Sequence, residues 1–299
     1  MDASSTLRAG PATPTATAGW INGLIGVAIF SGSLPATRIA VMTFDPVFLT
    51  LARAAIAGLA GVLLLAALRP VRPQRAEFMP LVIVALGVVV GFPLLTALAL
   101  RYVTAAHAIV FIGLLPIATA VFGTLRAGER PRPAFWAFSL AGAAIVSGYA
   151  LQEGSQASLL GDGLMLAAVV ACGLGYAEGA RLSRRLGGWQ VISWALLLSL
   201  PATLPAALLT LPATPQGIGW PALAALAYVS LFSMLIGFVF WYRGLAQGGI
   251  AAVGQLQLLQ PFLGFALAAL LLGEPIGWPL LAAAGAVVLC VAGARRFAN

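Results

Sequence analysis

Three glutamines in one apolar segment are the first candidates for binding chemistry in this sequence. Gln255, Gln257 and Gln260 all fall within residues 248–272, and each amide can both donate and accept hydrogen bonds. On a helix, Gln257 and Gln260 share a face, whereas Gln255 points largely away from Gln257. Polar side chains in such apolar segments tend to face a bundle interior or a water-filled cavity. We therefore expect at least one of the three amides to line a binding cavity.

Five further side chains are candidates for the same cavity. Ser33 could offer a hydroxyl to a ligand, or it could simply permit close helix approach, as small residues do. His107, the only histidine, could sense protons or bind a carboxylate, or it could be satisfied by backbone or water at a helix end. Phe111 lies one turn beyond it, and Tyr176 combines a ring that can pack with a hydroxyl that can bond. With Trp241, these residues suggest a pocket for a neutral or zwitterionic molecule with an apolar or aromatic body.

The acidic residues offer little for catalysis, metal binding or proton exchange. An enzyme site would need a positioned base or a metal, and no second histidine or carboxylate has ligand spacing around the single histidine. We therefore expect no enzyme, no metal and no cofactor, and the lack of an embedded acid disfavours a drug/proton antiporter. All eight acids fall in tails, loops or near helix ends: Asp2, Asp45, Glu77, Glu129, Glu153, Asp162, Glu178 and Glu274.

Two charged residues receive structural interpretations. Glu178 precedes Arg181 by three positions, which predicts an ion pair on one helix face. Arg53 lies about two turns inside an apolar stretch, where we expect it to extend toward the interface or to pair with Asp45 or with a helix end. The alternative for Arg53 is a role in gripping a carboxylate.

The composition requires lipid around these residues. The chain of 299 residues is 61% hydrophobic and 8% charged, with a mean hydropathy of +1.02. A soluble domain carries about 25% charged residues, so this chain cannot cover itself with polar surface. The formal charge of +8 is spread between apolar runs rather than clustered on one face, so we expect no nucleic-acid partner.

Apolar segments of about 20 residues can cross a membrane as helices, and cutting the chain at its Arg, Pro and Gly clusters predicts ten of them. Loops rich in basic residues stay in the cytoplasm, and thirteen of the sixteen arginines fall on one side if the amino terminus is inside. Both termini are then cytoplasmic, and we interpret residues 1–19 as a disordered cytoplasmic tail. The predicted spans are 20–40, 46–68, 79–101, 104–125, 134–151, 161–180, 190–211, 219–242, 248–272 and 277–294.

The two halves of the chain repeat each other. Pro116 aligns with Pro261, and Glu129 aligns with Glu274, both at a shift of 145 residues. The loop around Glu129 carries three arginines, whereas the loop around Glu274 carries no basic residue, so equivalent loops face opposite compartments. An inverted repeat of five spans is a recurring design of secondary transporters, and the two prolines are candidate kinks beside a cavity. The repeats cover residues 20–151 and 161–296.

Several segments in this order resemble an EamA-type member of the drug/metabolite transporter superfamily. The resemblance covers residues 20–296 and includes FSGSLPATRIAV (30–41), DPVFLTLARAAIAG (45–58) and WYRGLAQGGIAAVGQLQLLQPFLGFALAALLLGEP (241–275). It implies an all-α, ten-helix membrane bundle around a central cavity, lined chiefly by the first, third, fourth, sixth, eighth and ninth helices.

The same resemblance implies a function. Similar proteins are bacterial inner-membrane exporters of amino acids or related metabolites, and one branch exports aromatic amino acids. We expect a secondary transporter for a small molecule, embedded in lipid and working as a monomer. A carrier for another metabolite or drug and a non-transporting scaffold subunit are the alternatives.

Overall fold

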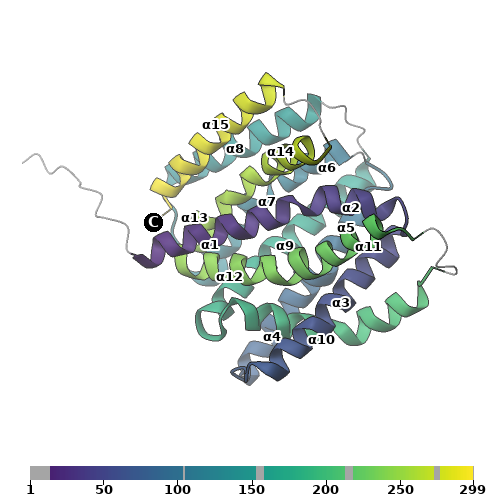
Figure 1. Ribbon diagram of the computed structural model, residues 1–299. Coiled ribbons are helices and arrows are strands. Elements are labelled where there is room, and N and C mark those ends of the chain that lie inside the picture. The colour runs from purple at the N-terminus through teal and green to yellow at the C-terminus, as the bar shows by residue number, and fades with distance from the viewer. Residues whose placement is uncertain (1–13, 104, 153–157, 213–217, 273–276, 299) are drawn as a thin grey trace, which may run out of the picture.

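The computed structural model describes residues 14–103, 105–152, 158–212, 218–272 and 277–298, and every regular element in these ranges is helical (Figure 1). Eight helical stretches among them are long and apolar enough to cross a membrane, and the apolar helix over Pro133–Tyr149 is shorter. The prediction of an all-α membrane protein is confirmed. Helix α1 begins at Pro14, so residues 14–19, assigned to the tail from the sequence, are helical, and residues 1–13 lie outside the described part.

The helices form ten successive segments, called spans 1–10 below. The first five are α1 (Pro14–Ser31) with α2 (Ser33–Val41); α3 (Pro46–Ala67); α4 (Arg75–Val84) with η1 (Ala85–Gly91) and α5 (Phe92–Ala99); α6 (Ala105–Ile112) with α7 (Leu115–Ala127); and α8 (Pro133–Gln152). The second five are α9 (Leu159–Leu186); α10 (Gly188–Leu209); α11 (Trp220–Ala227) with η2 (Tyr228–Ile236) and α12 (Gly237–Gly248); α13 (Ile250–Gly254) with η3 (Gln255–Leu259) and α14 (Gln260–Leu272); and α15 (Trp278–Arg296).

The two repeats share their backbone irregularities. Spans 3 and 8 each contain a π-helical stretch, η1 and η2, a conformation that is rare and often marks functional regions. Spans 4 and 9 each lose regular α-helical geometry directly before a proline, Pro116 in one and Pro261 in the other. A proline lacks the N–H for the helical hydrogen bond, and its ring clashes with the carbonyl four residues earlier. The duplication is thus visible in the backbone as well as in the sequence.

Spans 2 and 7, which are equivalent members of the two repeats, pack against each other in opposite directions. A Cβ added at Gly58 of α3 would meet Leu200 of α10, and one added at Gly61 would meet Ser193. Rising residue numbers on α3 therefore face falling numbers on α10, so the two helices are antiparallel.

Spans 5 and 10 show the same relation at the other edge of the bundle (Figure 1). Gly142 of α8 lies against Cys290 of α15, and Phe138 lies against Gly293. Equivalent helices that run in opposite directions are related by an axis in the membrane plane, which is the inverted-repeat arrangement. The predicted inverted fold is confirmed.

Most arginines gather at one end of this bundle, called the arginine-rich end below. There Arg185 of α9 contacts Glu77 of α4, and the Arg295 guanidinium lies 4.5 Å from the ring centre of Trp20. The first contact joins the end of span 6 to the start of span 3, and the second joins the end of span 10 to the first part of span 1. The other end of the bundle, called the opposite end below, carries the connections between spans 1 and 2 and between spans 3 and 4.

Candidate functional site

A cavity of 470 Å³ lies between the two repeats and reaches the surface at the opposite end. Val41, Pro46 and Leu100, which line its mouth, are exposed and come from the ends of spans 1, 2 and 3 at that side. Ligand pockets commonly enclose about 300–1,000 Å³, so a small metabolite fits this space. The lining draws on spans 1, 2, 3, 4, 6, 8 and 9, and thus on both repeats.

An aromatic cluster forms the inner wall of the cavity. Phe30 and Phe238 pack with ring centres 4.9 Å apart, and Tyr176 lies 6.0 Å from Phe238. Behind Tyr176, the Trp241 ring packs at 5.5 Å and is fully buried. This cluster closes the cavity on the side of the arginine-rich end and provides apolar surface for a ligand body.

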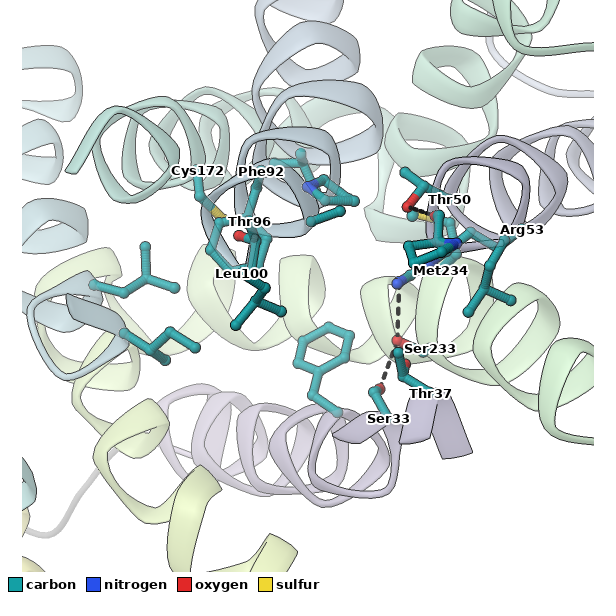
Figure 2. A pocket seen from close by; sticks show the side chains of 18 of the residues that line it. Ser33, Thr37, Thr50, Arg53, Phe92, Thr96, Leu100, Cys172, Ser233 and Met234 are labelled. Carbon is teal, nitrogen blue, oxygen red and sulfur yellow. Dashed lines mark hydrogen bonds between the residues drawn. The ribbon is translucent and has the colours of Figure 1, made fainter. Parts of the chain in front are cut away.

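A chain of polar side chains forms one wall of the cavity (Figure 2). The Ser33 hydroxyl donates to Ser233 Oγ at 2.7 Å, and Arg53 Nη2 donates to the same oxygen at a longer 3.5 Å. Arg53 Nε is buried and finds no hydrogen-bonding partner among the residues that the structure describes. Figure 2 shows Phe92, Thr96 and Cys172 across the cavity from this wall. The wall therefore presents a guanidinium whose donors are largely unused.

Asp45 does not neutralise Arg53, and the ion pair suggested by the sequence is absent. The Asp45 carboxylate instead caps its own helix, accepting the N–H groups of Val47 at 2.8 Å and Phe48 at 3.2 Å. Arg53 lies eight positions after Asp45, which is about 12 Å along a helix axis. This alternative for Arg53 fails because the Asp45 carboxylate already accepts the free N–H groups of the helix start.

The described lining of the cavity includes no aspartate or glutamate. Its two cations are Arg53, which is partly buried, and Arg101, which is exposed at the mouth. The cavity therefore carries positive charge without a fixed counter-ion of its own.

The candidates chosen from the sequence occupy three different places. Ser33, Tyr176 and Gln260 line the cavity together, and Trp241 lies directly behind Tyr176. Phe111 is partly buried, packs against the core and does not line the cavity, and its ring centre is 5.6 Å from that of His107.

His107 lies at the start of span 4, near the opposite end, outside the cavity lining. Its Nε2 is 2.7 Å from the Asp162 carboxylate at the start of span 6. The pair joins the two repeats at that end of the bundle. His107 thus contacts a carboxylate, but one that belongs to the protein.

Gln255 and Gln257 lie deeper, on the 3₁₀ stretch η3, and are 0% and 4% exposed. The Gln255 amide forms no hydrogen bond with any described residue, although a buried polar group without a partner costs about 1–3 kcal/mol. Neither residue lines the cavity, because η3 is packed between α7, α8, α15 and the first span.

Sequence reasoning missed Ser233, Thr96 and the aromatic Phe30, Phe92 and Phe238 as lining residues. Ser233 and Thr96 were detectable, because each is a polar side chain in an otherwise apolar stretch. The phenylalanines carried no such signal, since an apolar side chain in an apolar span looks the same whether it faces lipid or a cavity.

At the arginine-rich end, a fully buried carboxylate helps to close the bundle below the cavity. Glu178 accepts a hydrogen bond from Arg181 at 2.9 Å, which confirms the predicted pair, and it also contacts Arg126 from the end of α7. The Arg181 and Arg126 side chains are 40% and 45% exposed, so they are in contact with water while the carboxylate is not. Spans 4 and 6 are joined by this cluster.

Glu129 joins spans 4 and 9 at the same end of the bundle. Its two carboxylate oxygens accept the backbone N–H groups of Ile250 and Ala251, each at 2.7 Å. These N–H groups open α13 and have no partner within the helix, so the carboxylate caps span 9. The segment after span 4 is thereby attached to the start of span 9.

The chain is similar to known proteins and matches the model of one protein family. The model of the EamA-like transporter family matches residues 17–151 and again residues 159–295, once for each repeat. The uncharacterized transporter YdeK of Bacillus subtilis is 68% identical over 284 residues, covering 95% of this chain and 99% of that protein. An uncharacterized transporter of Archaeoglobus fulgidus is 27% identical over 192 residues, covering 64% of this chain and 66% of that protein. A solved crystal structure aligns with a TM-score of 0.79 over 94% of this chain and 98% of its own, and at 21% identity it shows the fold alone.

Proposed function

This chain belongs to the EamA-like transporter family, whose members are multi-pass membrane transporters and not enzymes. We propose that it exports neutral or aromatic amino acids from the bacterial cytoplasm by alternating access. The observation that carries the proposal is the cavity between the two inverted repeats, open at one end and closed at the other. Inverted repeats can exchange their conformations, so the same site would open to each side in turn.

The charge distribution supports an orientation for this state. Loops rich in arginine remain in the cytoplasm, so the arginine-rich end is the cytoplasmic end in our proposal. Both chain ends then lie in the cytoplasm, and the cavity faces the external side of the plasma membrane. The bacterial relative is consistent with that membrane.

The cavity chemistry supports an amino acid as the substrate. Phe30, Phe238 and Tyr176 provide an apolar and aromatic wall, and Ser33 and Ser233 provide hydroxyls that can both donate and accept. A volume of 470 Å³ accommodates a molecule of this size together with water. A small molecule with an apolar body and a short polar head matches these two walls.

The architecture supports a protein that works as a monomer, surrounded by lipid. Both repeats of the bundle come from one chain, and the cavity is lined by both of them. In this proposal no second protein completes the site.

Counterflow in liposomes tests the function. Purified protein is reconstituted with unlabelled amino acid inside, and uptake of labelled phenylalanine, threonine, alanine and lysine is compared with empty liposomes. We expect phenylalanine or threonine to exchange and lysine to be excluded, because the cavity lining is positively charged. If none of the four exceeds the empty control while a known carrier works, the amino-acid function fails. The alternatives of another metabolite or a non-transporting scaffold would then stand.

A further inference from the structure

We infer that Arg53 binds the carboxylate of the transported molecule, and that the cavity selects its ligand by that carboxylate and not by an ammonium group. The inference rests on the proposed function in one respect, namely that the cavity is the transport site. It adds the charged group that is recognised and the residue that recognises it.

The guanidinium of Arg53 has the donors that a carboxylate needs. Arginine carries five N–H donors in a planar fork that matches the two oxygens of a carboxylate. Only the 3.5 Å bond from Nη2 to Ser233 uses one of them among the described residues, and Nε bonds to none. Ser33 already donates to Ser233, so this serine oxygen holds the guanidinium in place without neutralising its charge.

The surroundings of Arg53 leave its charge uncompensated. The described lining has no acidic side chain, and Asp45, the acid in the same span, is used in capping the start of α3. A charge away from bulk water needs a partner to offset its lost hydration. A ligand carboxylate supplies that partner, whereas a ligand ammonium would be repelled by both Arg53 and Arg101.

The positions of the two walls also define a binding pose. The Ser33, Ser233 and Arg53 wall faces Phe92 and Thr96 across the cavity in Figure 2, and the aromatic cluster lies on the inner side. With its carboxylate at Arg53, a ligand can place an apolar body against Phe30 and Phe238. Arg101 at the mouth adds a positive potential that attracts anions toward the cavity.

A set of four related compounds tests which charge is recognised. Phenylalanine, 3-phenylpropanoate, phenethylamine and phenylalanine amide share one aromatic body and differ in carrying both charges, the carboxylate alone, or the amine alone. Each is measured by the rise in melting temperature of the purified protein in detergent and by competition with labelled phenylalanine in counterflow. We expect 3-phenylpropanoate to compete about as well as phenylalanine, and the two amines about tenfold or more weakly, because hydrogen bonds to charged groups are among the strongest in binding.

Variants then assign the effect to a residue. Arg53→Gln should lose at least about tenfold in apparent affinity for 3-phenylpropanoate, and Arg53→Lys should lose less because it keeps the charge but not the fork. Arg243→Gln is the matched control, since Arg243 is an exposed arginine of span 8 that lies outside the cavity lining, and its replacement should change affinity by less than about threefold. If Arg53→Gln does not fold, the compound series on the unaltered protein and the Arg53→Lys variant still decide whether Arg53 recognises the ligand carboxylate.

The outcomes separate this inference from the proposed function. If no amino acid exchanges but 3-phenylpropanoate stabilises the protein and this effect requires Arg53, the amino-acid function fails and the carboxylate site stands. If phenylalanine exchanges but phenethylamine competes equally well, or if Arg53→Gln behaves as Arg243→Gln does, the carboxylate site is overturned and the function stands.

Discussion

The carboxylate of Glu129 caps the helix that begins at Ile250, although the two residues are 121 positions apart and belong to opposite repeats. Spans 4 and 9 are equivalent members of the repeats, and α7 packs on α13 at this, the arginine-rich, end. At the opposite end the described residues of α6 form no comparable contact with α14, and the cavity reaches the surface there. If the two repeats exchanged their conformations, α7 would therefore separate from α13. Glu274, the sequence equivalent of Glu129, lies outside the described residues.

A disulfide across this contact should stop transport. A Cβ on Gly123 would lie 3.2 Å from Ile250 Cβ, close to the 3.5–4.5 Å that a disulfide needs. The double variant Gly123→Cys with Ile250→Cys should exchange substrate when reduced and lose exchange when oxidised. Each single variant under the same oxidant is the control. Undiminished exchange by the fully cross-linked protein would show that these helices need not separate.

Replacement of Glu178 should weaken the same end of the bundle. Glu178→Gln keeps the shape but removes the charge-assisted bonds to Arg181 and Arg126. Because both arginine side chains are 40–45% exposed and their charges are screened by water, we expect a loss of only about 1 kcal/mol in the free energy of unfolding. Denaturation in detergent measures this loss, with Glu77→Gln, which removes the charge of the contact with Arg185 between spans 3 and 6, as the comparison. An unfolding free energy that rises in Glu178→Gln would contradict this assignment.

Gln255→Leu should stabilise the conformation that the structure describes. Its buried amide has no hydrogen bond to the described residues, so leucine removes an unsatisfied group and fills a similar volume. We expect a gain of about 1 kcal/mol, visible as a higher melting temperature. Gln260→Leu is the comparison, since Gln260 lines the cavity and can reach water. A melting temperature lowered by Gln255→Leu would mean that the amide is satisfied in the dominant state.

Close helix contact between spans 1 and 8 depends on glycine. A Cβ on Gly244 would lie 2.6 Å from the backbone nitrogen of Gly23, so Gly244→Ala must push the two helices apart. We expect destabilisation of about 2 kcal/mol or more. Gly285→Ala on α15, where nothing lies within 4 Å, should instead be neutral or stabilising by about 1 kcal/mol through helix propensity. Equal melting temperatures for the two variants would contradict the close contact.

The architecture could be predicted from the sequence because it depends on properties that can be read directly along the chain. Apolar length, arginine placement and the spacing of Pro116 and Pro261 predict the spans, their orientation and the inverted duplication without any knowledge of side-chain contacts. Antiparallel packing of equivalent helices is the spatial result.

The residues that line the cavity could be predicted from the sequence only in part. Ser33, Tyr176 and Gln260 line it, but Gln255 and Gln257 are buried below it, because span 9 changes from α-helical to 3₁₀ geometry between Gln255 and Leu259. Regular helical spacing does not hold through such a change, and η3 packs against several other helices. Which part of a transporter lines the cavity also depends on the conformational state, and a sequence does not specify the state.

The most direct test of the account uses a cysteine in the cavity. Thr96→Cys is introduced into a variant in which the native Cys172 and Cys290 are replaced by alanine, because Cys172 also lines the cavity. The protein is labelled in membrane vesicles of both orientations with a maleimide that does not cross the membrane, with and without 3-phenylpropanoate, and the variant without Thr96→Cys is the control. We predict labelling from the external side, protection by 3-phenylpropanoate, and loss of that protection when Arg53→Gln is added. Absence of labelling from the external side, or equal protection with and without Arg53, would contradict an outward-open cavity in which Arg53 holds the carboxylate.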